Sequence, residues 1–196
     1  MILYASPLSP FARKVSIAAA ELGVALTAVD AMPLDNPPEL LAANPLGKVP
    51  ALLTGDGMAL FDSAVIVQAV NEMGGGGLLP ASGPARWAAL RDEALADGIC
   101  EAGVALNGEK RRPAEQQSPL WMDRYRNAIL RALDVAEAAV PATGAPLPLP
   151  AIALVCALDY IDFRHPELAW RTGRPALTAW WEGLKDHPVV KATKPA

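Results

Sequence analysis

The sequence is poor in the residues that mark metal sites and disulfide scaffolds. Only Cys100 and Cys156 are cysteine, and only His165 and His187 are histidine. The cysteine spacing matches neither a zinc motif nor a disulfide framework, and both stand among apolar residues at helix-like positions. We predict that both are reduced thiols in the core. No metal is expected, because neither histidine shares a helix face with a second type of ligand.

A concentration of positive charge is also missing. The chain has 17 Lys and Arg residues against 21 Asp and Glu residues, for a formal net charge of -4 at pH 7, and it has no basic block. Binding to a phosphate backbone requires such a block. The sequence therefore predicts no nucleic-acid partner.

No uncharged run looks able to form a membrane-spanning helix. The longest, 138–158, is long enough, but its first half contains Pro141, Gly144, Pro146, Pro148 and Pro150. These residues break a spanning helix. Residues 1–5 lack the basic start of a signal peptide. We expect no membrane partner and a cytoplasmic location.

What the sequence does have is material for a large core. Hydrophobic residues make up 52% of the 196 positions and charged residues 19%, a composition typical of a folded globular protein. This length fits one large domain or two small ones, so a boundary must come from the pattern.

The first 80 residues predict an α/β domain. Its expected elements are a strand over 1–5, a helix over 11–22, a strand over 24–29, a short helical turn over 39–43, strands over 49–53 and 58–61, and a helix over 64–73. Gly55-Asp56-Gly57 predicts a tight hairpin, which makes the last two strands antiparallel. The order is that of a thioredoxin-like domain with a four-stranded mixed sheet.

The rest of the chain predicts an all-α domain. Four glycines, Gly74 to Gly77, and a proline-bounded segment up to Pro84 form the clearest change in composition, so we place domains at 1–80 and 85–196. Helical periodicity covers 85–106, 120–139, 151–163 and 175–185. Gly98 and Gly103 each weaken the first of these helices by about 1 kcal/mol. We interpret them as sites of close packing, with close approach to a ligand as the alternative.

Three motifs occur in order on this topology: Ser9-Pro10-Phe11, the segment from Asn44 to Pro50, and Phe61-Asp62-Ser63. Together they resemble the cytosolic glutathione S-transferases, and the chain is most similar to the small bacterial YibF-like branch. The resemblance covers essentially the whole chain, including Ala96–Ile99 and the tail from Thr178 to Pro188.

This resemblance implies a detoxification enzyme with glutathione as co-substrate. Residues 1–80 would bind glutathione, and its thiolate would attack an apolar small-molecule electrophile held by residues 85–196. A homodimer is implied, with each N-terminal domain packed on the partner's helical domain. The alternatives are a non-catalytic glutathione-binding or regulatory protein and a glutathione-dependent isomerase or dehalogenase.

Ser9 is the implied catalytic residue. By itself, Ser9 followed by Pro10 is an ordinary helix N-cap. A hydroxyl at the positive end of a helix can also stabilise a thiolate, and Ser6 is the second candidate for this role. No cysteine precedes Cys100. A thiol-transfer mechanism with a cysteine of the N-terminal domain is therefore excluded.

The resemblance assigns the other glutathione-binding residues. Phe11 is included among the glutathione-binding residues because it belongs to the Ser9-Pro10-Phe11 motif. A cis bond at Val49-Pro50 would turn the Val49 backbone toward the cysteinyl unit, and Lys48 would meet the glycyl carboxylate. Asp62-Ser63 would bind the γ-glutamyl ammonium and α-carboxylate. Each assignment has a purely structural alternative: Pro50 as a proline at a strand edge, Lys48 as a solvated surface lysine, and Asp62-Ser63 as ordinary capping residues.

The chain departs from the family in two places. Pro148 and Ala151 stand where many members have a capping box, so that local device for starting a helix is absent. No second lysine lies among Leu34, Asp35 and Asn36, which implies a lower glutathione affinity.

The helix over 85–106 would line the second-substrate pocket with residues such as Trp87, Asp97 and Glu101. Three further tryptophans, Trp170, Trp180 and Trp181, are interpreted as packing residues.

Overall fold

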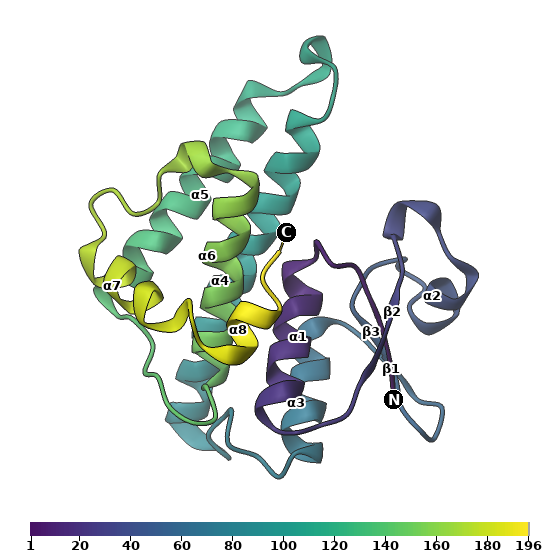
Figure 1. Cartoon of the computed structure of the whole chain (residues 1–196). Coiled ribbons are helices and arrows are strands. Elements are labelled where there is room, and N and C mark those ends of the chain that lie inside the picture. Colours follow the sequence, from purple (N-terminus) through teal and green to yellow (C-terminus); the bar gives the residue numbers. More distant parts are fainter. Residues whose placement is uncertain (196) are drawn as a thin grey trace.

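Four short strands and three helices make up the first part of the chain, and helices make up the rest (Figure 1). The computed structural model describes residues 1–195. The first part contains β1 (Ile2–Ala5), α1 (Pro10–Glu21), β2 (Thr27–Asp30), α2 (Pro38–Ala43), β3 (Ala51–Leu53), β4 (Ala59–Leu60) and α3 (Ser63–Met73). The second contains α4 (Gly83–Lys110), α5 (Pro119–Ala138), α6 (Leu149–Arg164), α7 (Pro175–Leu184) and α8 (Pro188–Ala192).

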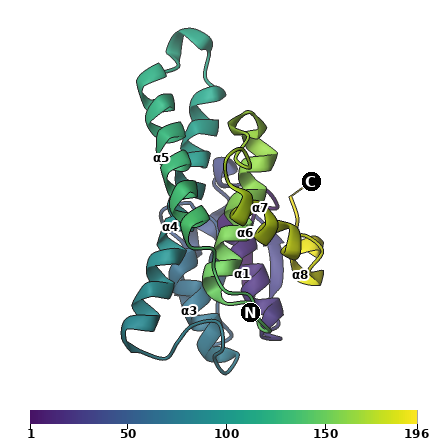
Figure 2. The same cartoon turned by 90° about the vertical axis from the view of Figure 1, so that its left-hand side faces the viewer.

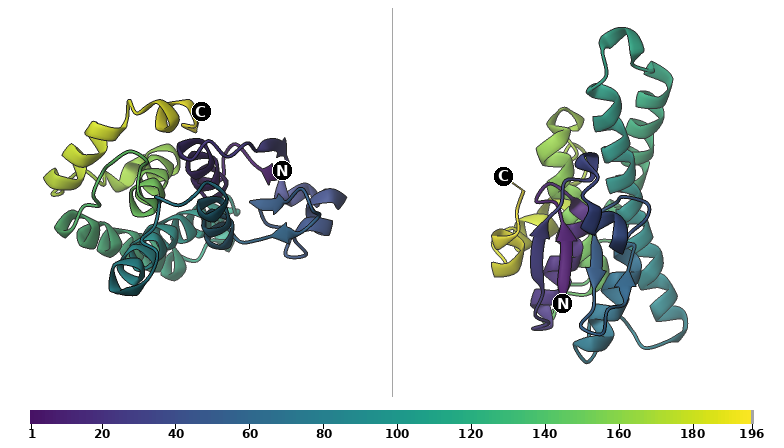
Figure 3. Two further views of the ribbon diagram at one scale, coloured as in Figure 1. Left: turned by 90° about the horizontal axis from the view of Figure 1, so that it is seen from below. Right: turned by 90° about the vertical axis from the view of Figure 1, so that its right-hand side faces the viewer.

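The strands form one mixed sheet in the order β2-β1-β3-β4. The β1 and β2 strands are parallel, whereas β1 with β3 and β3 with β4 are antiparallel. Leu3 of β1 pairs with Leu52 of β3, and both side chains are buried. Figure 1 and Figure 3 show the strands on one side of the molecule, with α2 on their outer face and the other helices on the opposite side. The predicted four-stranded mixed sheet is confirmed.

The second strand begins three residues later than the sequence pattern predicts. Gly23 adopts a left-handed φ of 66°, and the Val24 N–H donates to the Ala19 carbonyl at 2.8 Å. This is how a helix commonly ends, and it uses residues that the pattern assigns to the strand. Because β2 is an edge strand, its residues Thr27–Asp30 are all exposed.

The helical part is built around α6. Its residues Leu149 to Ile161 are all buried. The helix α4 packs beside it and α5 packs on α4, and these two extend beyond α6 as a long hairpin (Figure 2). Among residues 1–195, no helix combines the length and apolarity that crossing a membrane requires.

A contact with the first part of the chain stands at the start of α6. Pro148 precedes the helix and offers no side-chain cap, but the Leu149 N–H donates to the Leu78 carbonyl at 2.9 Å. This bond satisfies a donor that the helix itself cannot pair. The periodicity predicted a start at Ala151, but the helix starts at Leu149. A long-range contact there replaces the missing capping box.

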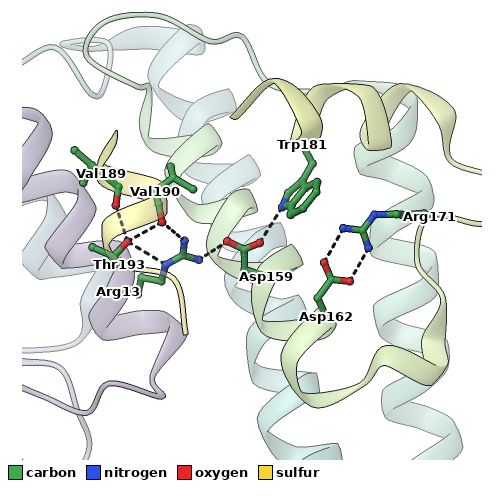
Figure 4. A network of polar contacts seen from close by, with 8 residues as sticks. All are labelled: Arg13, Asp159, Asp162, Arg171, Trp181, Val189, Val190 and Thr193. Carbon is green, nitrogen blue, oxygen red and sulfur yellow. Dashed lines mark hydrogen bonds and ion pairs between the residues drawn. The ribbon is translucent and has the colours of Figure 1, made fainter. Parts of the chain in front are cut away.

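A buried arginine of α1 joins the two parts of the chain. Arg13 forms an ion pair with Asp159 of α6 at 2.9 Å and donates to the Val190 carbonyl at 2.9 Å. The Trp181 indole donates to the same Asp159 at 2.9 Å. Figure 4 shows Arg13 between Asp159 and the residues of the short helix α8. The sequence pattern gave no sign of α8, which is too short for a periodicity to appear.

The predicted core residues are largely confirmed. Cys100 and Cys156 are free and buried, and burial raises the pKa of the Cys156 thiol to about 12. Trp170 and Trp181 are buried, while Trp180 is half-buried.

The two α4 glycines have different surroundings. A Cβ built on Gly103 would lie 3.1 Å from the Tyr160 ring, so its predicted close packing is confirmed. A Cβ on Gly98 would meet nothing within 4 Å. The prediction that Gly98 marks close packing against another element of the chain is therefore wrong.

Candidate functional site

A cavity of about 600 Å³ lies where the sheet-bearing part meets α4 and α6. Its lining includes every residue that the sequence motifs assign to a site: Ser9, Phe11, Lys48, Val49, Pro50, Asp62 and Ser63. These residues come from three separate loops and helix starts. The fold therefore brings the three motifs to one cavity.

Ser9 stands at the start of α1. Its Oγ accepts a hydrogen bond from the Ala12 N–H at 3.2 Å, which confirms the N-cap. A hydroxyl that accepts one bond keeps its own proton for donation. The side chain is half-buried and borders the cavity at the positive end of the helix dipole. Capping and a contact with a bound anion are thus compatible in one side chain.

Ser6 is placed almost equivalently. Its carbonyl accepts from the Ser9 N–H at 2.9 Å, and its side chain is buried. Both serines line the large cavity, and both also line a smaller one of about 300 Å³ that Arg13 and Thr193 border. Position alone does not separate the two candidates.

A buried asparagine shapes the loop that carries Lys48. The Asn44 Nδ2 donates to the Lys48 carbonyl at 2.8 Å, and its Oδ1 accepts from the Leu46 N–H at 3.0 Å. The Val49–Pro50 peptide bond is cis, as the resemblance implied. In the sequence, Asn44 stands out only as the first residue of the motif that ends at Pro50. Its position before a proline is a turn signal that indicates this role.

The start of α3 borders the cavity from another side. Asp62 caps the helix through Oδ1, which accepts from the Ala64 N–H at 3.1 Å. Ser63 is buried, and within residues 1–195 its hydroxyl forms no hydrogen bond. The first N–H groups of a helix have no partner inside it. A carboxylate could bind here, as the resemblance implied, with Asp62 beside it.

The opposite wall comes from α4 and α6. Asp97, Glu101, Val104 and Ala105 line it from α4, and Tyr160 lines it from α6. The suggestion of Trp87 is wrong, because its side chain is 68% exposed and lies outside the cavity. The periodicity of α4 allowed several faces, and only the packing of the two parts selects one.

A buried charge cluster lies behind this wall. The Lys14 ammonium is 2.8 Å from Glu93 Oε1 and 2.5 Å from Asp97 Oδ2. Burial, opposed by Lys14, raises the pKa of both carboxyl groups. Burial also acts to lower the Lys14 pKa, but the two carboxylates outweigh it and raise that pKa. One ammonium therefore holds Asp97 in place at the edge of the cavity.

The family comparison agrees with this geometry. Residues 3–76 match the model of the glutathione S-transferase N-terminal domain, and residues 119–182 match that of the C-terminal domain. The chain belongs to the glutathione S-transferase family. Individual relatives support this membership over the full length.

An uncharacterized GST-like protein of Escherichia coli K12, YibF, is 36% identical over 199 residues, which cover 100% of this chain and 98% of YibF. A glutathione transferase family member from Pseudomonas fluorescens Pf-5, solved with bound glutathione, is 40% identical. Its TM-score is 0.92, and the match covers 100% of this chain and 98% of the Pseudomonas chain. A second structure of a family member from this organism, with bound S-(propanoic acid)-glutathione, is 38% identical with a TM-score of 0.87 and covers 100% of both chains.

Proposed function

We propose that this chain is a serine-type glutathione transferase that conjugates glutathione to an apolar electrophile. The observation that carries the proposal is the convergence of all seven motif residues on one cavity. Residues 1–80 bind glutathione, and residues 85–196 complete the electrophile site. The relatives with bound glutathione support the choice of co-substrate.

Glutathione would lie along the N-terminal wall. The N–H groups at the start of α3 and the Ser63 hydroxyl bind its α-carboxylate, and Asp62 faces its ammonium. The Val49 backbone pairs with the cysteinyl unit. The Lys48 side chain, which is exposed and lines the cavity, meets the glycyl carboxylate. This orientation brings the sulfur toward Ser9.

Ser9 would stabilise the thiolate by donating its hydroxyl proton in a hydrogen bond. Lowering a thiol pKa from roughly 8.5 to about 6.5 corresponds to about 2.7 kcal/mol. A hydrogen bond to a charged group contributes about 1.5 to 3 kcal/mol, and a helix terminus about 0.3 to 1. The sulfur then forms a bond to carbon, while a leaving group departs with the electron pair of the broken bond.

The experiment replaces the candidate hydroxyls one at a time. Ser9→Ala is expected to lose most turnover while it keeps its affinity for glutathione, because it removes the thiolate donor but none of the carboxylate contacts. Ser16→Ala is the matched control, since Ser16 lies on α1 but does not line the large cavity. If Ser6→Ala loses the activity and Ser9→Ala keeps it, the catalytic role belongs to Ser6.

Product analysis tests the type of reaction. A conjugate supports the transferase. A rearranged substrate or a released halide without conjugate would mean an isomerase or dehalogenase with the same thiolate. Glutathione bound as a thiol with no turnover would favour a regulatory protein. The proposed assembly is a homodimer in the cytoplasm, and a monomer mass in light scattering at micromolar concentration would contradict the dimer.

A further inference from the structure

Glu101 lies on the helical wall of the cavity, the wall that the proposed function assigns to the second substrate. It lies on α4 one turn after Asp97 and one turn before Ala105, and all three line the cavity. Within residues 1–195, no hydrogen bond or ion pair joins its side chain to another residue. Its charge is therefore available to a bound molecule.

The other acidic residues of the cavity already have partners. Asp97 is paired with Lys14 at 2.5 Å, and Asp62 caps α3 through the Ala64 N–H. The proposed glutathione site further assigns Asp62 to the γ-glutamyl ammonium. Glu101 is the carboxylate that neither the fold nor glutathione uses.

Positive charge lies on the opposite wall. Among the described residues that line the cavity, Lys48 is the single cation, and it belongs to the N-terminal wall. The residues around Glu101 on the helical wall, Val104 and Ala105, are apolar, as is Leu8 across the cavity. A molecule held against the helical wall thus meets apolar side chains and two carboxylates, of which Asp97 is already paired with Lys14 and Glu101 is not.

We infer that the second substrate is an electrophile with an apolar body and a cationic group, and that Glu101 determines this preference. The inference rests on the proposed function and names its substrate class. A positive group near Glu101 gains from the charge, whereas a carboxylate there is repelled. Anionic electrophiles should therefore be poor substrates.

Binding of three conjugates, which differ only in the charge at the end of the sulfur substituent, tests the preference without turnover. The probes are S-(3-aminopropyl)glutathione, the neutral propanamide conjugate and S-(propanoic acid)-glutathione, measured by calorimetry at low salt. The aminopropyl conjugate is expected to bind about three- to tenfold more tightly than the propanoate, with the propanamide between them. Glu101→Gln should bring this ratio close to one.

Glu115→Gln is the matched control. It makes the same change in net charge, but Glu115 lies in the exposed turn between α4 and α5, away from the cavity. The ratio should stay as in the wild type. Equal affinities, a preference for the propanoate, or a ratio that Glu101→Gln does not change would overturn the inference. Failure of glutathione and all three conjugates to bind would instead contradict the proposed function.

Discussion

At the scale of single residues, His165 shows how burial fixes a protonation state. Its Nε2 lies 2.8 Å from the Gly103 carbonyl oxygen and its Nδ1 lies 2.8 Å from the Lys110 ammonium. The first nitrogen donates and the second accepts, so the ring is neutral. Burial and the nearby Lys110 lower the pKa of His165, despite the opposing contacts of Gly103 and Glu167.

This pKa predicts a loss of stability in acid. Because the pKa is lower in the folded chain than in the unfolded one, the unfolded chain binds more protons below about pH 6.5. The free energy of unfolding should therefore fall as the pH falls from 6.5 through the folded pKa. Urea unfolding at pH 7.5 and pH 5.5 measures this loss.

His165→Gln isolates the contribution of this ring, since the amide can still donate to Gly103 but does not titrate. It should lose less stability between the two pH values than the wild type. Equal losses in His165→Gln and the wild type would contradict the account.

At the scale of elements, the two glycines of α4 form a natural pair for a stability test. Gly98→Ala should stabilise the protein by about 0.5 to 1 kcal/mol, because alanine is the better helix former and the site is open. Gly103→Ala should destabilise it by about 1 to 3 kcal/mol, because the new methyl group would lie only 3.1 Å from the buried Tyr160 ring, which must shift to make room. Chemical denaturation measures both, and effects of the same sign would refute this explanation.

The elements differ in how far the sequence predicts them. Local signals sufficed for the hairpin at Gly55–Gly57 and for the capped helices α1 and α3. Long-range contacts set the rest. The start of α6 depends on Leu78, and α8 is held by Arg13, 177 residues away from Val190 in sequence.

At the scale of the whole molecule, the Lys14 cluster links the two parts of the chain. Lys14→Met leaves Glu93 and Asp97 buried without their cation, and we expect it to reduce the free energy of unfolding by about 3 to 5 kcal/mol. Adding Glu93→Gln and Asp97→Asn to Lys14→Met should restore much of this loss.

Arg91→Met provides the contrast for this prediction. Its partner Asp92 is a neighbour in sequence, and the Arg91 side chain is 75% exposed, so we expect a cost below about 1 kcal/mol. A Lys14→Met protein as stable as Arg91→Met would show that the cluster does not hold the two parts together.

The candidate site was predictable where it depends on contiguous motifs. Ser9, Lys48 and Asp62 stand in short segments whose order identifies the family. The helical wall was predictable only in part: of the three residues that the resemblance suggested, Asp97 and Glu101 line the cavity and Trp87 does not. Asp97 is held there by Lys14, 83 residues earlier in sequence. A periodic pattern marks the faces of α4 but not the partner of each face.

The most direct test of the central claim is a pH titration of the ultraviolet thiolate absorbance of glutathione bound to the purified protein, with Ser9→Ala and Ser16→Ala beside it. Ser9 at the start of α1 predicts a thiolate at neutral pH in the wild type and in Ser16→Ala, and its loss in Ser9→Ala. Bound glutathione that remains a thiol at neutral pH, or a thiolate that persists in Ser9→Ala, would contradict the proposed role of Ser9.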